Sequence, residues 1–327
     1  MTTAPHLGEF ERIARFFAPL AAPQALGLVD DVALIDGPPG EQYVLKTDAI
    51  VEGVDYFPGD PPGQIAQKLL RVNLSDLAAK GATPLGYLLT TILPKSCDET
   101  WLEAFAAGLA ADQATYGIGL LGGDSSATPG PATLSVTAIG RVATGKAVLR
   151  GGAKPGDLIY VSGTIGDATL GLAALKGEIE GLEPAARDFL VDRYHLPQPR
   201  LALGQKLVGL AHAAIDISDG LIADLGHLCG ASRLGASLRA EDVPLSPAAR
   251  AALEASKKSR TMLFSGGDDY ELLFTAPPNL AYKIEAAMRA AGVTVTRIGE
   301  MEAGHGVKLL DAQGEPIPID RAGYSHF

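Results

Sequence analysis

The spacing of apolar residues changes several times along the chain, and each change predicts a different secondary-structure element. Apolar residues recur every three or four positions in the predicted helices, which cover residues 8–20, 64–80, 99–116, 163–175, 184–194, 200–210, 222–232, 280–291 and a segment after Ser246. Short apolar runs predict strands at residues 28–35, 43–48, 85–93, 133–142, 158–161, 213–215, 236–240, 270–275 and 294–298. Helices and strands alternate, which predicts an α+β or α/β fold.

One stretch, Asp216-Ile-Ser-Asp-Gly-Leu221, combines an apolar lead-in with two carboxylates and a hydroxyl. An earlier stretch, Asn73-Leu-Ser-Asp76, resembles it. Each is followed by a Gly-Gly-Asp sequence, which ends at Asp124 in the first case and at Asp268 in the second. The intervals from the last aspartate of each stretch are 48 and 49 residues. We interpret this pattern as a degenerate two-fold repeat of an acidic α/β unit.

The length of 327 residues exceeds what one hydrophobic core usually organises, so we expect two domains. The turn-rich segment 145–157 is the candidate boundary, which gives a first domain of residues 1–150 and a second of residues 151–327. The first predicted helix, residues 8–20, is amphipathic and is expected to pack against the first domain.

Composition and charge exclude several classes of protein. Hydrophobic residues make up 47% of the chain and charged residues 20%, as in ordinary soluble domains. The net charge of -11 argues against a nucleic-acid partner, because binding to phosphates needs a basic surface. The two cysteines fit a reducing cytoplasm, and no apolar run approaches the roughly 20 residues of a membrane span. We therefore expect a soluble cytoplasmic protein without a membrane partner.

Carboxylates are the most informative class of side chain. They lie at junctions between apolar runs and turns or helices, at Asp30, Asp31, Asp48, Asp76, Asp124, Asp216 and Asp219. A helix cap or a turn explains any single one of them. Convergence of the whole set would be opposed by strong repulsion at separations of about 4 Å, so such a cluster requires cations. Oxygen donors without His or Cys select hard ions, and Mg²⁺ is the one that accompanies phosphates.

The common phosphate-binding motifs do not account for such a site. Gly117-Ile-Gly-Leu-Leu-Gly122 matches GxGxxG, but it follows a predicted helix instead of a strand, which excludes a dinucleotide site. The chain has no GxxxxGK[ST] sequence. Gly122-Gly-Asp-Ser-Ser126 is a glycine turn that gives weak support for anion binding. Arg150 is either a surface charge or a phosphate clamp.

Short acidic and glycine-containing motifs extend over nearly the whole chain. They are Val29-Asp-Asp31, Thr47-Asp48, Val51-Glu-Gly53, Asn73-Leu-Ser-Asp-Leu-Ala-Ala79, Gly122-Gly-Asp124, Gly152-Ala-Lys-Pro-Gly-Asp157, Asp216-Ile-Ser-Asp-Gly-Leu221 and Gly266-Gly-Asp-Asp-Tyr-Glu-Leu272. With these motifs the chain resembles the thiamine-monophosphate kinase family, within the superfamily typified by aminoimidazole ribonucleotide synthetase. The resemblance implies a two-domain aminoimidazole ribonucleotide synthetase-like fold. Its first domain would bind ATP and Mg²⁺ and dimerise through a β-barrel shared by both subunits.

The resemblance also implies ATP-dependent phosphorylation of thiamine monophosphate to thiamine diphosphate, the last step of thiamine diphosphate biosynthesis. By motif position, the residues implied to hold Mg²⁺ are Asp31, Lys46 through its backbone, Thr47, Asp48, Asp76, Asp124, Asp216 and Asp219. Those implied to contact ATP are Tyr116, Gly123, Asp124, Arg150 and Ser218. Catalysis would depend on Asp48, Asp76, Asp124 and Asp219, with direct in-line attack by the acceptor phosphate on the γ-phosphate of ATP.

The chain departs from the family pattern where the thiamine substrate is expected. The family commonly has His at the position of Asp55, Glu at that of Asp268 and an aromatic residue at that of Arg321. Two alternatives remain. Another ATP-using member of the superfamily is disfavoured, because the chain lacks a Cys near its start and ends in His326-Phe327 instead of Cys. A non-catalytic, acidic, divalent-cation-binding protein belongs to a different class and predicts metal binding without release of ADP.

Overall fold

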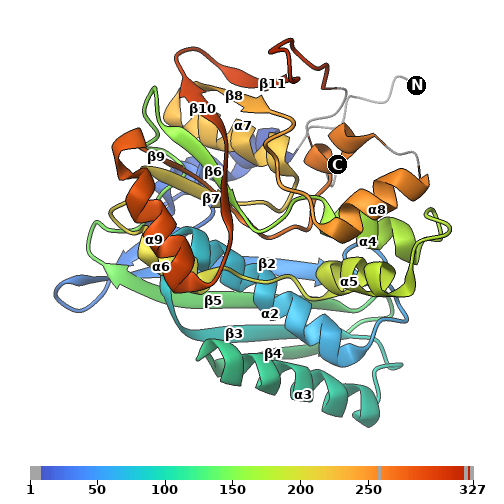
Figure 1. The fold of residues 1–327 in the computed structure, drawn as a ribbon. Helices are drawn as coiled ribbons and strands as arrows, with labels where there is room; N and C mark the ends of the chain where they lie inside the picture. Colours follow the sequence, from blue (N-terminus) through green and yellow to red (C-terminus); the bar gives the residue numbers. More distant parts are fainter. Residues whose placement is uncertain (1–8, 257–258, 320–322, 325–327) are drawn as a thin grey trace, which may run out of the picture.

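The computed structural model describes residues 9–256, 259–319 and 323–324, which form two halves, each built on one open, mixed sheet (Figure 1). The first sheet has the order β1-β2-β5-β3-β4, in which β3 and β4 are parallel and the other pairs antiparallel. Its strands are Ala33–Asp36 (β1), Glu41–Val51 (β2), Thr83–Leu93 (β3), Gly119–Ala127 (β4) and Thr133–Ala143 (β5).

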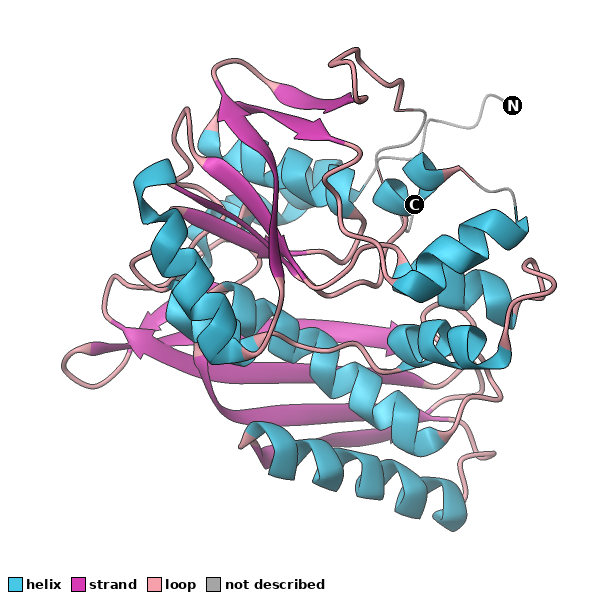
Figure 2. Cartoon of the chain, in the orientation of Figure 1, coloured by secondary structure: helices cyan, strands magenta, loops and turns pink. Residues whose placement is uncertain are grey.

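Two long helices, Pro62–Ala79 (α2) and Glu99–Tyr116 (α3), lie along one face of this sheet (Figure 2). Asp98 caps the N-terminus of α3, because its side chain accepts a hydrogen bond from the Trp101 N–H at 2.9 Å. Alternate residues of β5, such as Leu134 and Val136, are fully buried beneath α2. The opposite face is more exposed, with Leu88 of β3 42% accessible.

The second sheet has the order β11-β8-β10-β6-β9-β7. Its strands are Leu158–Ser162 (β6), Ala213–Asp216 (β7), Gly235–Arg239 (β8), Leu272–Ala276 (β9), Val295–Glu302 (β10) and Gly306–Leu310 (β11). The helices of this half are Asp167–Leu175 (α4), Pro184–His195 (α5), Leu201–Leu207 (α6), Leu221–Ser232 (α7), Pro247–Ser256 (α8) and Ala281–Ala291 (α9). One core lies between this sheet and α4, α5, α7 and α8, and α6 and α9 pack on the other face.

Helix α2 connects the two halves. It packs against β2 and β5 on one side and against α6 and β7 on the other, so one of the two hydrophobic clusters extends across both halves. A helix buried on both sides has no solvated face for polar residues, yet α2 carries Asn73, Asp76 and Lys80 at its C-terminal end, all buried. Burial of such groups is costly unless they are paired or bind a ligand, so this end of α2 marks the candidate site.

Most of the predicted helices and strands are confirmed, including the long helices α2 and α3 and the central strand β5. Strand β4 was missed, because its Gly122-Gly-Asp-Ser-Ser126 stretch was predicted to be a turn. A Cβ atom at Gly123 would lie 1.8 Å from the Leu89 carbonyl oxygen, so glycine serves here to let β4 approach β3. Strand β11 was also missed.

Two further sequence predictions are wrong. The repeat is not present as a structural unit, because Asp76 lies inside helix α2, whereas Asp219 lies in the turn between β7 and α7. The first predicted helix starts with Glu9–Arg12 (α1) and continues through Ile13–Phe17 and Ala18–Leu20 as π and 3₁₀ turns. Phe17 and Leu20 are 56% and 81% exposed, so the expected packing of its apolar side is not observed.

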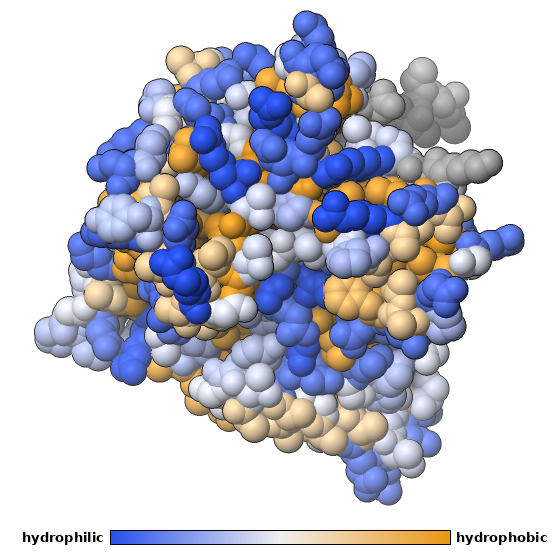
Figure 3. All heavy atoms as spheres, viewed as in Figure 1, coloured by the Kyte–Doolittle hydropathy of each residue, from blue (hydrophilic) through white to orange (hydrophobic). Residues whose placement is uncertain are grey.

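None of the helices in the described segments is long and apolar enough to cross a membrane. Apolar side chains do lie exposed along the lower edge of the molecule, where Figure 1 places α3 (Figure 3). Leu102 of α3 is 44% exposed.

Candidate active site

Three buried carboxylates meet between the two halves. Asp31 precedes β1, Asp76 lies in α2 and Asp216 ends β7, and one oxygen of each lies within 4.8 Å of the other two. Asp48 of β2 joins them through Lys46, whose Nζ lies 3.2 Å from Asp48 Oδ1 and 3.1 Å from Asp76 Oδ2. We call Asp31, Asp48, Asp76 and Asp216 the carboxylate cage. The structure thus brings together four of the residues predicted to hold Mg²⁺.

Cationic side chains accompany the cage. Lys80 Nζ, which is fully buried, lies 2.8 Å from Asp31 Oδ2 and 3.0 Å from Asp30 Oδ1. Arg150 forms a bidentate pair with Asp31, with Nε 2.9 Å from Oδ2 and Nη2 on Oδ1. Arg150 is therefore an internal group next to the cage, and its interpretation as a surface charge is wrong. Bidentate guanidinium groups suit planar anions such as carboxylate and phosphate.

Burial and neighbouring charges shift the pKa values of the cage in opposite directions. Burial, followed by the charge of Asp216, raises the pKa of Asp76 well above its usual range. Burial and the charge of Asp31 raise the pKa of Asp216 to about 6. Burial would also raise the pKa of Asp31, but Lys80 and Arg150 outweigh it and hold that pKa below its usual range. Carboxylates that repel one another in this way have a strong electrostatic preference for added cations.

The cage has the donor chemistry of a hard-metal site. Its donor atoms are carboxylate oxygens from four different parts of the chain, and Asp76 and Asp216 are 4% and 3% exposed. Oxygen-only donor sets of this kind suit Mg²⁺. Lys46 was predicted to contribute its backbone, and the structure shows in addition that its ammonium group lies between two carboxylates.

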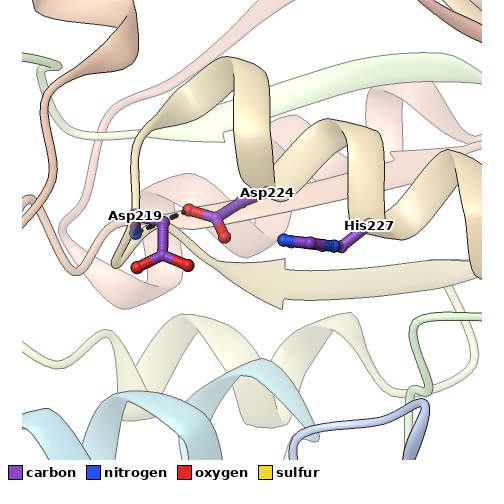
Figure 4. A group of neighbouring side chains, drawn as sticks. All are labelled: Asp219, Asp224 and His227. Atoms are coloured by element: carbon purple, nitrogen blue, oxygen red, sulfur yellow. Dashed lines mark hydrogen bonds between the residues drawn. The ribbon is translucent and has the colours of Figure 1, made fainter. Parts of the chain in front are cut away.

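A second group consists of Asp219, Asp224 and His227, whose ligand atoms also lie within 4.8 Å of one another (Figure 4). Asp224 Oδ2 accepts hydrogen bonds from the backbone N–H groups of Ser218, Asp219 and Gly220, at 3.0, 3.1 and 3.1 Å. This carboxylate therefore fixes the loop that carries two predicted site residues, Ser218 and Asp219. The sequence interpretation missed Asp224, although its place in the first turn of α7 is typical of an acid that binds N–H groups.

The second group differs from the cage in its electrostatics. Burial and then the charge of Asp219 raise the pKa of Asp224 well above its usual range. Burial and the charge of Arg150 lower the pKa of His227 to about 4. Because one oxygen of Asp224 accepts three backbone hydrogen bonds, this group is mainly a scaffold for the loop.

Asp124 does not join the cage within one chain. Asp124 of β4 pairs with Thr90 of β3, Thr90 pairs with Ser135 of β5, and Ser135 pairs with Ala49 of β2. Three strand spacings of about 4.8 Å therefore separate Asp124 from β2. Alternation places Asp124 with Ser135 on the exposed face, whereas Asp48 lies with buried Val136 on the face toward α2. The prediction that Asp124 belongs to the same site therefore fails for a single chain.

Other predicted residues lie around this region. Thr47 points to the exposed face, where its Oγ1 donates a hydrogen bond to the Val136 carbonyl at 3.1 Å. Tyr116 ends α3, and the Arg71 guanidinium lies 5.7 Å from its ring centroid. Gly123 lies in edge strand β4. These positions surround the first sheet and do not converge on the cage in one chain.

Two of the three predicted acceptor residues meet at a buried lysine. Lys68 Nζ lies 2.9 Å from the Asp55 carbonyl oxygen, 3.3 Å from Asp268 Oδ2 and 3.8 Å from the centroid of the Tyr194 ring. Asp268 has a φ of 68°, a left-handed conformation that Asp adopts more readily than most residues. Arg321 lies outside the described residues. Lys68 and Tyr194 were missed by the sequence interpretation.

Both halves of the chain match family models of known proteins. Residues 29–142 match the family model of the AIR synthase related protein, N-terminal domain, and residues 154–312 match that of the AIR synthase related protein, C-terminal domain. The chain therefore belongs to the AIR synthase related proteins.

Curated relatives that match this chain over nearly its full length include thiamine-monophosphate kinases. The chain is 43% identical over 323 residues to the thiamine-monophosphate kinase of Caulobacter vibrioides, with 97% of this chain and 90% of the relative covered. It is 41% identical over 323 residues to that of Escherichia coli K12, with 98% of each covered. Among solved structures, AaThiL complexed with AMPPCP and TMP matches it with a TM-score of 0.87 at 30% identity, covering 100% of both chains.

Proposed function

We propose that the chain catalyses the ATP-dependent phosphorylation of thiamine monophosphate to thiamine diphosphate, the last step of thiamine diphosphate biosynthesis. The full-length relatives are thiamine-monophosphate kinases, and AaThiL binds AMPPCP, an analogue of ATP, together with TMP. The observation in this chain that carries the proposal is the convergence of Asp31, Asp76 and Asp216 beside Arg150. Phosphoryl transfer depends mostly on positioning and charge neutralisation, which such a site provides.

The cage residues Asp31, Asp48, Asp76 and Asp216 are the ones we assign to Mg²⁺, and the loop residue Asp219 lies close in sequence to Asp216. Bound Mg²⁺ would neutralise the charge of the transferred phosphoryl group. Arg150 is placed by Asp31 so that its guanidinium faces the cage, where it would orient a phosphate. A phosphate monoester with a second pKa near 6 is largely dianionic at neutral pH, so the acceptor attacks the γ-phosphate directly without a general base.

We also propose that the protein is a homodimer formed through the first sheet. Every residue of edge strand β4 is exposed, which leaves an unpaired strand edge that soluble proteins normally cover. Strands β3 and β5 are interior strands of this sheet, and its exposed edges are β1 and β4. Asp124, Gly123 and Thr47 retain their predicted roles only if a second subunit approaches this face, because one chain does not bring Asp124 to its own cage.

Two finer assignments accompany this function. We place the division between an N-terminal ATP- and Mg²⁺-binding domain and a C-terminal α/β domain at residues 150 and 151, within the segment that separates β5 from β6. We place the protein in the cytoplasm, where its two free cysteines stay reduced.

A coupled assay of ADP release, with and without thiamine monophosphate, tests the function. We expect release that depends on both Mg²⁺ and thiamine monophosphate. Metal binding without ADP release would indicate the non-catalytic cation-binding protein, and release that requires a different acceptor would indicate another ATP-using member of the superfamily.

Light scattering with a Leu88→Asp variant tests the dimer. Leu88 is 42% exposed and pairs with Thr137 on the face opposite α2. We expect the wild type to have twice the monomer mass and the variant to be monomeric, folded and inactive. A fully active monomer would contradict the dimer.

A further inference from the structure

Lys46 lies in the middle of β2 with its side chain among the cage carboxylates. It pairs with Ala138 of β5, a fully buried residue, so its side chain points toward α2. The side chain is 15% exposed, and Nζ lies between Asp48 Oδ1 at 3.2 Å and Asp76 Oδ2 at 3.1 Å. Such a group is costly to bury unless opposite charges surround it, and here two carboxylates do.

Lys46 differs from the other lysine of the site in how it is held. Lys80 is fully buried, binds Asp30 and Asp31, and is also fixed by the Ala214 carbonyl at 3.3 Å. In the part of the chain that the structure describes, the contacts of the Lys46 ammonium are the two carboxylates. A flexible four-carbon stem connects this ammonium to the strand, so the group can move away without disturbing β2.

The carboxylates that bind Lys46 are the same ones that we assign to Mg²⁺. A divalent cation and an ammonium group that share two carboxylates repel each other, and each weakens the binding of the other. Without metal, removal of Lys46 would leave Asp48 and Asp76 beside Asp31 and Asp216 with one positive charge fewer.

We infer that Lys46 is an internal counter-ion of the carboxylate cage, which stabilises the metal-free protein and competes with Mg²⁺ for Asp48 and Asp76. This inference rests on the proposed Mg²⁺ site. It makes metal loading an exchange of one cation for another, so the cage keeps a charge partner before metal and ATP arrive.

Substitution of Lys46 by methionine, which keeps the apolar stem and removes the charge, tests the inference. Lys68→Met is the matched control, because Lys68 is also a buried lysine paired with a carboxylate, Asp268, outside the cage. Two quantities are measured for both variants and for the wild type: the melting temperature in EDTA, and the affinity for Mg²⁺ alone by calorimetry.

We expect Lys46→Met to lower the melting temperature in EDTA by several degrees and to raise the Mg²⁺ affinity at least tenfold. Lys68→Met should lower the melting temperature but leave the Mg²⁺ affinity within twofold of the wild type. Lys46→Arg, which restores a positive charge, should return both quantities toward wild-type values. The double variant Lys46→Met, Asp48→Asn removes one charge of each sign and should recover most of the melting temperature in EDTA.

Unchanged or weaker Mg²⁺ binding by Lys46→Met would overturn the inference while leaving the cage intact. Lys46→Met could be too unstable to isolate without metal, and the double variant then decides. Absence of a cooperative melting transition of the double variant in EDTA would show that Lys46 acts through packing instead of charge. If the wild type and Asp76→Asn bind Mg²⁺ equally, the proposed metal site fails, which is a separate result from the comparison of the lysine variants.

Discussion

Asp76 and Asp224 are both buried aspartates in helices beside the 216–220 segment, but their oxygens have different partners. Asp76 faces other carboxylates and the Lys46 ammonium. One oxygen of Asp224 accepts three backbone N–H groups of the loop. A backbone donor is fixed in place, whereas an ammonium group can be exchanged for another cation. The partners of a buried carboxylate therefore indicate whether the carboxylate binds a ligand or holds the backbone in place.

The Gly266-Gly-Asp-Asp-Tyr-Glu-Leu272 motif extends this comparison. Glu271 is fully buried and is held by Arg193 Nη2 at 2.9 Å, Arg200 Nε at 2.7 Å and Ser162 Oγ at 2.5 Å. Asp269 accepts the Gly166 N–H through both oxygens, at 3.0 and 2.9 Å. Glu271 and Asp269 are therefore scaffold carboxylates like Asp224, because hydrogen-bond donors that are fixed in the fold bind their oxygens. Within the same motif, Asp268 faces Lys68 and belongs to the predicted acceptor region.

The largest effect should come from the cage residues Asp48 and Asp76 and from Asp219 of the neighbouring loop. We expect Asp48→Asn, Asp76→Asn and Asp219→Asn each to lower turnover at least 100-fold while the protein remains folded, since each removes a charge that we assign to metal and phosphate binding. Steady-state ADP release at limiting Mg²⁺ measures this effect.

Asp36→Asn is the control for these variants, because Asp36 is an exposed aspartate at the end of β1 in the same sheet. It should retain wild-type turnover. Near wild-type turnover of the cage variants would remove the distinction between binding and scaffold carboxylates.

A smaller effect, on stability, should come from the scaffold carboxylate. Asp224→Ala leaves three backbone N–H groups without their acceptor, and we expect it to lower the free energy of unfolding by about 2–3 kcal/mol. Asp224→Asn keeps an oxygen acceptor and should lose less. Urea unfolding in EDTA measures both variants, and stability of Asp224→Ala within about 0.5 kcal/mol of the wild type would show that the loop does not depend on this carboxylate.

The sequence predicts much of this site because apolar periodicity and short motifs are local signals. They correctly placed α2, β2 and β7, whose acids meet in the cage. They did not reveal the role of Asp224, because the partners of a buried carboxylate cannot be read from local periodicity. Lys80 was missed for the same reason, since its contact with Asp31 spans 49 residues.

Asp124 illustrates a second limit. Its Gly-Gly-Asp motif lies where the backbone of β4 approaches that of β3 closely, but the sequence does not give the face of the sheet. Only the pairing of β4 with β3 and of β3 with β5 places Asp124 on the face opposite the cage. The glycine-rich composition of residues 122–126 predicted a turn, but these residues pair with β3 and form part of the edge strand β4.

An effect of intermediate size should come from Asp55. Its Oδ2 accepts the Val51 N–H at 2.7 Å, and its carbonyl oxygen binds Lys68. We expect Asp55→His to change the KM for thiamine monophosphate by a few-fold to tenfold, about 1 kcal/mol. The KM for ATP should stay constant, because the cage is unaffected, and initial-rate kinetics with each substrate varied in turn measure both. A change confined to ATP would show that this side chain belongs to the nucleotide half of the site.

The smallest effect should depend on pH and concerns a scaffold carboxylate just before the N-terminus of α2, the end of this helix opposite Asp76. Asp60 Oδ1 lies 3.1 Å from His195 Nε2 of α5, and its Oδ2 accepts the Phe57 N–H at 2.9 Å, so it links the two halves. Burial raises the pKa of Asp60, but the hydrogen bonds from His195 and Phe57 outweigh it and the pKa is lowered.

A lowered pKa in the folded protein means that the charged form of Asp60 is stabilised by folding. Its contribution is therefore present above the unfolded value of about 3.9 and is lost as the pH falls through the folded pKa. We expect Asp60→Asn to be about 1 kcal/mol less stable than the wild type at pH 7, with the difference disappearing once the pH falls below the folded pKa of Asp60. Urea unfolding of both proteins over that range gives the difference directly, and protonation of other carboxylates cancels in the comparison. A difference that persists unchanged at low pH would show that Asp60 acts through its shape and not through its charge.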